Sequence, residues 1–312
     1  LPLIYELLTS FIFLLIGIVL LYYGADWIVK SGVHIASQFQ IPHFVIGLTL
    51  VAFGTSLPEL VVSLKAALDG YSGIAIGNIV GSNIANVGLV LGISSTIFPI
   101  FIQFKLIKRE IGIYFIVCCF LVLFMLDYRI NQWEGLVLFL GIIVYTLWCI
   151  KSPVEEPKEV SDQLHSTFGT WILLALGIIV LYLGSKSFVK GAIDMAHIFK
   201  VDEVVIGMSI VAFGTSLPEL ATSVIAAFRR ESALSMGNII GSNLFNILLV
   251  LGLVSIIKPI DISSGILTFE IPVMILFGLV LIPLSFMRQP VSRASSVLLF
   301  IGYVIFLFNL NW

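Results

Sequence analysis

The chain has 312 residues, of which 59% are hydrophobic and only 11% are charged, and its mean hydropathy is +1.14. Soluble globular domains carry about 25% charged residues, so most of this chain is expected to face lipid or other buried helices. The net charge of −2 gives no indication of nucleic-acid binding or of a strongly charged partner. Composition therefore excludes an ordinary soluble domain and predicts a membrane protein.

Apolar runs of about the 20 residues that a membrane-spanning helix needs recur along the whole chain. The first run continues through Leu20–Tyr23 without a cleavage-site pattern, so it is interpreted as a true span and not as a signal peptide. The runs predict ten transmembrane helices, near residues 8–29, 43–66, 73–98, 110–126, 133–150, 168–186, 203–227, 233–257, 265–286 and 294–311.

The two halves of the chain are copies of each other. A shift of 160 residues aligns 41–95 with 201–255 without a gap and with 29 identities in 55 pairs, and VAFGTSLPEL occurs in both. With five spans in each half, the second copy enters the membrane from the opposite side. The sequence thus predicts an all-α membrane protein of two inverted five-helix repeats, 1–150 and 168–312, joined by a cytoplasmic linker at 151–167. Secondary transporters have this architecture, with substrate sites near the midplane.

The Lys and Arg residues in the loops indicate the orientation, because cytoplasmic loops carry an excess of them. One face, which includes Lys30 and Arg229, has ten of these residues, and the face with Lys65 and Lys186 has six. The ten-cation face is therefore placed in the cytoplasm. Both termini are then expected to be extracellular, in a multi-pass protein of the plasma membrane.

Glu59 and Glu219 are the strongest functional candidates, because each lies in the middle of an apolar span. An ionisable group there costs about 2.5–3.5 kcal/mol on insertion scales and normally faces a cavity or a partner. Pro58 and Pro218 directly precede them, and proline inside a helix lacks an N–H donor. The two spans are expected to break near the midplane, with free carbonyls around 52–55 and in the second copy, so that backbone lines a cavity. The alternative is a carboxyl that only packs against a backbone donor.

The next span in each half adds oxygen atoms on one helix face, because its polar residues recur at every fourth position. The pocket that results has no His or Cys, which argues against zinc, copper and iron. It suits calcium, which takes six to eight oxygen ligands. Two glutamates balance one divalent ion or several monovalent ions, which is a physical basis for exchange. The alternative for the amides is that they only hydrogen-bond neighbouring helices. The residues of the stripe are Asn78, Ser82 and Asn86, repeated as Asn238, Ser242 and Asn246.

The motif GTSLPEL at 54–60 and 214–220, followed by GNIVGSNIANVGLVLG at 77–92 and GNIIGSNLFNILLVLG at 237–252, resembles the two alpha-repeats of sodium/calcium exchangers. The resemblance covers essentially the whole chain. It implies calcium/sodium antiport by alternating access, in which the first and sixth helices slide past a fixed core. It also implies a prokaryotic type without a regulatory domain, no cofactor, no catalytic residue, and a chain that functions as a monomer in the bilayer.

The resemblance also implies which residues bind the ions. Calcium would bind Glu59, Glu219 and the backbone carbonyls of Thr55 and Thr215. Sodium would bind Ser56, Ser82, Ser216, Ser242, the backbone of Ala52 and Ala212, and the same two glutamates. Asn86 and Asn246 would flank the centre. Proton-coupled relatives resemble a Gly-Asn-x-x-Glu motif where this chain has GTSLPE, and potassium-dependent relatives carry Asp at the position of Asn246, so both differences favour sodium alone.

Three other functions remain open from the sequence. A proton/calcium antiporter could use the same two-glutamate site, and a passive cation channel could share the broken helices. An intramembrane enzyme could use the glutamates as acid and base. Such an enzyme usually needs two different environments for its two groups, whereas the duplication predicts matched ones, so it is the least favoured.

Overall fold

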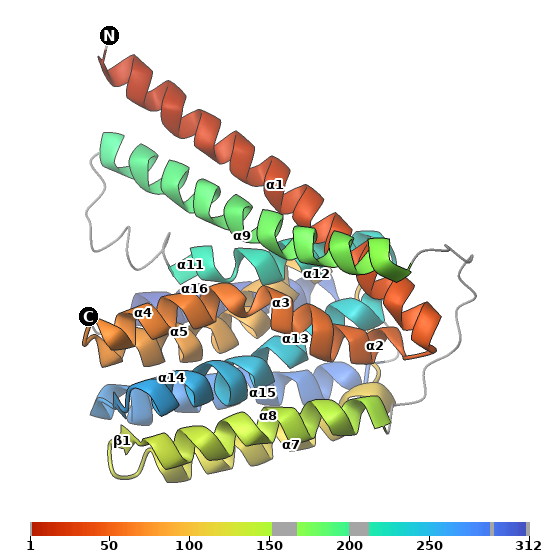
Figure 1. Cartoon of the computed structure of the whole chain (residues 1–312), viewed down its shortest axis with the longest axis vertical. Coiled ribbons are helices and arrows are strands. Elements are labelled where there is room, and N and C mark those ends of the chain that lie inside the picture. The colour runs from red at the N-terminus through yellow and green to blue at the C-terminus, as the bar shows by residue number, and fades with distance from the viewer. Residues whose placement is uncertain (1, 152–166, 200–211, 288–289, 310–312) are drawn as a thin grey trace.

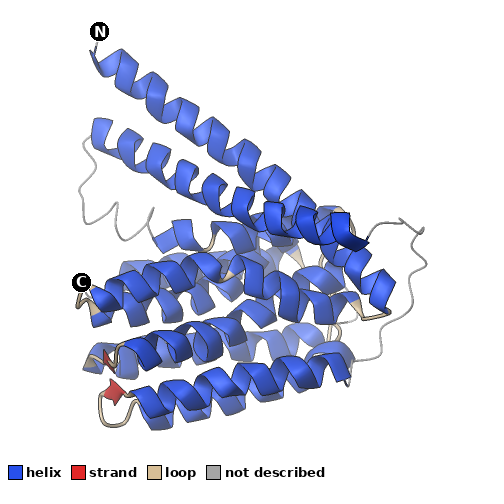
Figure 2. Ribbon diagram, in the orientation of Figure 1, coloured by secondary structure: helices blue, strands red, loops and turns tan. Residues whose placement is uncertain are grey.

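The computed structural model describes residues 2–151, 167–199, 212–287 and 290–309, and these are mostly helical (Figures 1 and 2). The first half contains α1 (Pro2–Phe39), α2 (His43–Ile46), the π-helix η1 (Gly47–Val51), α3 (Ala52–Thr55), α4 (Leu57–Leu68), α5 (Ser72–Ala85), the π-helix η2 (Asn86–Leu91), α6 (Gly92–Ile97), α7 (Phe104–Phe124), β1 (Arg129–Ile130) and α8 (Gln132–Lys151). The second contains α9 (Thr167–Ile198), α11 (Ala212–Thr215), α12 (Leu217–Phe228), α13 (Ser232–Phe245), the π-helix η4 (Asn246–Leu251), α14 (Gly252–Ile257), β2 (Ile260–Asp261), the π-helix η5 (Ile266–Glu270), α15 (Ile271–Ser285) and α16 (Arg293–Asn309).

Described helices lie in each of the ten predicted ranges, although the start of the seventh and most of the predicted linker lie outside the described residues. By length and hydropathy, six described helices could span a bilayer, or seven with the bent pair α2–α4. Within the described residues, the exception to the all-α prediction is a two-residue antiparallel pairing of β1 with β2 at one end of the helices (Figure 2). The predicted first span was too short, because α1 continues until Gln40 takes a positive φ of 54° just before Pro42.

Helices α1 and α9 form an antiparallel pair that crosses the remaining helices at an angle (Figure 1). Their axes approach closely at glycines. A Cβ added to Gly24 would lie 2.6 Å from the backbone nitrogen of Leu181, and one added to Gly184 would lie 2.7 Å from that of Leu21. The 160-residue shift aligns Gly24 with Gly184 and Leu21 with Leu181. The two contacts are therefore the same contact made once by each copy, with the copies running in opposite directions.

The predicted breaks lie directly before the prolines. Helix α3 ends at Thr55, and Ser56 has φ −82° and ψ 1°. The axis of α4 is bent by 42° from that of the preceding segment His43–Thr55. Ser216 has nearly the same angles, φ −85° and ψ 2°, between α11 and α12. The predicted free carbonyl at Ala52 is wrong: it accepts a bond from the Ser56 N–H at 3.0 Å, because the last turn before the break closes normally.

Buried apolar side chains form two clusters. The smaller cluster lies along α1 and α9, with residues such as Ile28 and Leu181, and extends to Leu217 and Leu234 of the underlying helices. The larger cluster joins the other helices of both halves. The α1–α9 pair thus packs on the rest of the protein through an apolar layer of its own, which lies over the broken helices.

We predict that Gly24→Ala and Gly184→Ala each lower the stability of the protein by about 1–3 kcal/mol, because the new methyl group overpacks against backbone. Thermal unfolding in detergent would measure the loss. Gly112→Ala in α7 is the matched control, because its Cβ would meet nothing within 4 Å. Gly24→Ala and Gly184→Ala variants as stable as Gly112→Ala would contradict the importance of the close approach.

Candidate ion-binding site

Glu59 and Glu219 lie in the first turns of α4 and α12, directly after the two breaks. Both side chains are fully buried, and their charges lie near enough to repel each other. The first turn of a helix carries unpaired N–H groups and a partial positive charge, which favours a carboxylate there. The prolines therefore both break the spans and put each glutamate at a new helix N-terminus.

Nine buried oxygen atoms in this region have no hydrogen-bond partner. Such atoms are costly, because they have lost water without gaining another partner. Every one belongs to a residue that the sequence predicted for the site. They are Oγ of Ser56, Ser82 and Ser216, both carboxyl oxygens of Glu59 and of Glu219, and Oδ1 of Asn86 and Asn246. Elsewhere in the described residues, six buried polar side-chain atoms without a partner are scattered over Ser31, Ser94, Glu110, Tyr145, Thr222 and Ser255.

The two halves contribute these oxygens to each other. The hydroxyl of Ser56 lies beside Glu219, and that of Ser82 beside Glu59, in both cases outside hydrogen-bond geometry. The Thr55 hydroxyl also lies beside Glu219. It donates to Oδ1 of Asn238 at 3.2 Å and is 3.3 Å from Oγ of Ser242. The first-half break is thereby connected to the polar stripe of the second half.

The other predicted ligands lie at the same breaks. Thr215 is buried at the end of α11, while Ala52 and Ala212 are the first residues of α3 and α11. Ser242 is buried but is partnered by Thr55, so its hydroxyl differs from that of its copy Ser82. The site is symmetric in sequence but not fully so in hydrogen bonding.

Asn86 and Asn246 are each held by the opposite half. The Asn86 amide donates to Oδ1 of Asn243 at 3.0 Å, and the Asn246 amide donates to Oδ1 of Asn83 at 3.3 Å. These bonds turn the amide nitrogens away and leave the two Oδ1 atoms without a partner. Both asparagines are also the first residues of π-helices, η2 and η4, and such irregular turns are frequent at functional sites.

Asn83 and Asn243 were not among the predicted site residues, although both lie within the repeated GSN motif and recur at the 160-residue shift. Ser63 and Ser223 were not predicted either. The Asn78 amide donates to Ser63 Oγ at 2.9 Å and, more weakly, to the carbonyl of Glu59 at 3.4 Å. The Asn238 amide donates to Ser223 Oγ at 3.1 Å in the same way. For these two amides, the alternative of bonding neighbouring helices is confirmed.

The site is made of oxygen atoms of several kinds. Among the described residues no three His, Cys, Asp or Glu side chains gather in one place, so hydroxyl and amide oxygens must supply most of the contacts to an ion. Two carboxylates with neutral oxygens suit hard cations such as calcium, in a flexible geometry of six to eight ligands. They do not suit the softer transition metals.

Comparison with known proteins agrees with this chemistry. The family model described as sodium/calcium exchanger protein matches the chain twice, over residues 9–151 and 169–312. The chain belongs to the sodium/calcium exchanger family. It is 34% identical to the sodium/calcium exchanger MaX1 of Methanosarcina acetivorans over 96% of this chain and 97% of that protein. It is 31% identical to the inner membrane protein YrbG of Escherichia coli K12, over 96% of both chains.

Solved structures of the sodium-calcium exchanger NCX_Mj have the same fold. One of them, soaked with Na⁺ and Sr²⁺, superposes with a TM-score of 0.85 at 34% identity, over 98% of this chain and 100% of that one. Family membership identifies the chain as a multi-pass membrane antiporter that moves calcium against another cation, and the family is one of transporters and not of enzymes.

We predict that Asn243→Ala and Asn83→Ala each weaken calcium binding about fivefold. Each change removes the acceptor that orients Asn86 or Asn246, and a net hydrogen bond is worth about 1 kcal/mol. Calorimetry on the purified protein would measure the affinity. Ser94→Ala is the control, because Ser94 is buried without a partner outside the site. Unchanged affinity in both asparagine variants would show that they do not position the site.

Proposed function

We propose that the protein exchanges calcium for sodium across the plasma membrane by alternating access. The observation that carries the proposal is the set of nine buried, unpartnered oxygens, four of them carboxylate oxygens, drawn from both halves of the chain. Two carboxylates balance one calcium ion or two sodium ions. Either loading neutralises the pair, so the two ions compete for the same charges.

Calcium binds Glu59, Glu219 and the carbonyls of Thr55 and Thr215 in this proposal, with Asn86 and Asn246 beside the centre. Sodium uses the serine hydroxyls, the backbone of Ala52 and Ala212, and the same glutamates. The serines are Ser56, Ser82, Ser216 and Ser242, of which all but Ser242 have no hydrogen-bond partner. Proton coupling would require only the carboxylates, whereas these hydroxyl oxygens are ligands for a metal ion. They therefore favour sodium over the proton-coupled alternative.

The proposed architecture is ten transmembrane helices in two inverted repeats, 1–150 and 168–312, with the linker 151–167 in the cytoplasm and both termini outside. The double match of the family model and the reciprocal glycine contacts between α1 and α9 support two inverted copies. The whole site lies within one chain, which supports function as a monomer.

We expect calcium uptake into proteoliposomes only when sodium is loaded inside and a sodium gradient points outward. The measurement is accumulation of radioactive calcium in sodium-loaded vesicles and in sodium-free vesicles that carry only a pH gradient. Uptake driven by the pH gradient alone would replace the proposal with proton/calcium antiport through the same glutamates. Calcium flux without any counter-ion would indicate a channel.

Glu59→Gln and Glu219→Gln are each expected to reduce sodium-driven calcium uptake by at least about 100-fold, because one remaining charge cannot balance a buried divalent ion. The readout is the initial uptake rate, with protein folding checked by gel filtration. Glu6→Gln is the control, because Glu6 is an exposed residue near the start of α1. Wild-type rates in both glutamine variants would show that the ions bind elsewhere.

A further inference from the structure

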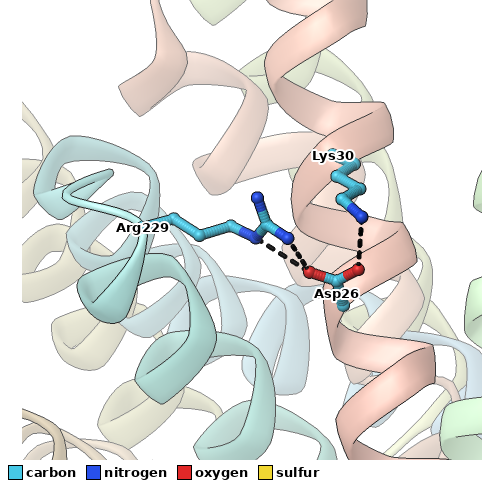
Figure 3. Close-up of polar contacts among 3 residues, drawn as sticks. All are labelled: Asp26, Lys30 and Arg229. Atoms are coloured by element: carbon cyan, nitrogen blue, oxygen red, sulfur yellow. Dashed lines mark hydrogen bonds and ion pairs between the residues drawn. The ribbon is translucent and has the colours of Figure 1, made fainter.

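Asp26 forms an ion-pair cluster where α1 packs against the end of α12 (Figure 3). Its Oδ1 accepts bonds from Nε of Arg229 at 2.8 Å and from Nη2 of the same guanidinium. Its Oδ2 lies 2.8 Å from Nζ of Lys30, one turn further along α1. Asp26 is buried, and Arg229 directly follows the last residue of α12. The cluster therefore fastens the angled helix α1 to a helix that carries one of the site glutamates.

The 160-residue shift gives this pair a counterpart with its charges exchanged. Asp26 corresponds to Lys186 on α9, and Arg229 corresponds to Asp69 at the end of α4. An acid on α1 and a base after α12 are thus matched by a base on α9 and an acid after α4. Both positions carry the opposite charge in the other repeat, so the two counterpart residues are again oppositely charged.

The counterpart pair is not formed in this structure. Asp69 instead pairs with Lys65 of its own helix at 2.6 Å, and Lys186 is exposed on α9. The helix contacts differ in the same way, since α1 packs on α12 whereas α9 makes no comparable contact with α4, both of which are fully described. The structure is therefore asymmetric at the two positions where the repeats are equivalent.

We propose that Asp26–Arg229 and Lys186–Asp69 are alternating latches, one for each access state of the antiporter. The inference rests on the proposed alternating access between two inverted repeats. In such a protein the second state is reached when each repeat adopts the conformation of the other. Helix α9 then takes up against α4 the position that α1 has against α12 here, and Lys186 reaches Asp69 as α1 releases Arg229.

The two latches lie on opposite faces of the membrane. Lys30 and Arg229 belong to the face with ten loop cations, and Lys65 and Lys186 belong to the other. The present state is thus latched at the Arg229 face and opens its site toward the Asp69 face. Each state keeps one of the two latch pairs, so the number of latch pairs is the same in both states. The two states can therefore have similar free energies, and ion binding can shift the population between them.

The test measures apparent calcium affinity separately on each face in oriented proteoliposomes that exchange calcium for sodium. Arg229→Gln removes one latch but leaves Asp26 paired with Lys30. It should weaken affinity about three- to tenfold on the Asp69 face and strengthen it on the Arg229 face, because apparent affinity follows the population of the competent state. Asp69→Asn should shift both affinities in the opposite directions. A residue that only stabilises the fold would not produce changes of opposite sign.

Two control variants isolate the latches. Arg230→Gln removes a positive charge one residue away from Arg229. Lys65→Gln removes the exposed partner of Asp69 and leaves Asp69 itself in place. Both should leave the two affinities nearly unchanged, because Arg230 is in neither latch and the Lys65–Asp69 pair is exposed, where an ion pair contributes little stability. If wild-type protein shows no sodium-driven exchange, the proposed function fails. If exchange is present but Arg229→Gln and Asp69→Asn shift the affinities in the same direction, or not at all, only the latch proposal fails.

Cross-linking between the two positions of each latch is a second measurement, because it reports their proximity directly and does not depend on transport. In a background with Cys118, Cys119 and Cys149 replaced by Ala, cysteine pairs at positions 26 and 229 and at positions 69 and 186 should each be bridged by a short bifunctional methanethiosulfonate reagent, because the long Arg and Lys side chains hold the backbones too far apart for a direct disulfide. Each cross-link should stop turnover by trapping one state, and reduction should restore it. Cross-linking at 26 and 229 without any at 69 and 186 would overturn the second latch.

Discussion

The fold has to accommodate two buried carboxylates, Glu59 and Glu219, that form no ion pair with a basic side chain among the described residues. Glu59 and Glu219 have no hydrogen-bond partner for any of their four oxygens, and in a low-dielectric interior this arrangement is unfavourable without a bound cation. The breaks at Ser56 and Ser216 relieve part of that cost, because they place each carboxylate at a helix N-terminus. In the proposed mechanism, the transported ion supplies the remaining positive charge.

The duplication explains how such a site can be built and still change its access. Copies that run in opposite directions bring two equivalent breaks together, and each half then supplies oxygens to the other, as Ser56 does to Glu219. The helices that cover the site pack differently. The α1–α9 pair meets at glycines, and it packs on the underlying helices through the smaller apolar cluster. An apolar contact without directional bonds is compatible with the proposed sliding, whereas the larger cluster holds the other helices together.

Sequence predicted the parts of the site that depend on local chemistry. A proline before a buried glutamate, repeated at a fixed shift, was sufficient to place the breaks and the carboxylates. The hydrogen bonds from Asn86 to Asn243 and from Asn246 to Asn83 were not predictable, because they depend on the register between two helices far apart in the chain. Asp26 and Arg229 gave no signal either, since their copies carry the opposite charges and a search for identities passes over them.

The asparagine pairing also fits a proposed pocket of two carboxylates and not three. The Asn246 amide donates to the side-chain Oδ1 of Asn83, and its own Oδ1 is left without a partner. An ionised Asp at 246 could not donate that bond, and its charge would add to those of Glu59 and Glu219. Asn246 therefore adds an oxygen dipole at fixed orientation without a charge. The pocket is then neutral with one calcium ion or with two sodium ions, and a third monovalent ion would have to be held by dipoles alone.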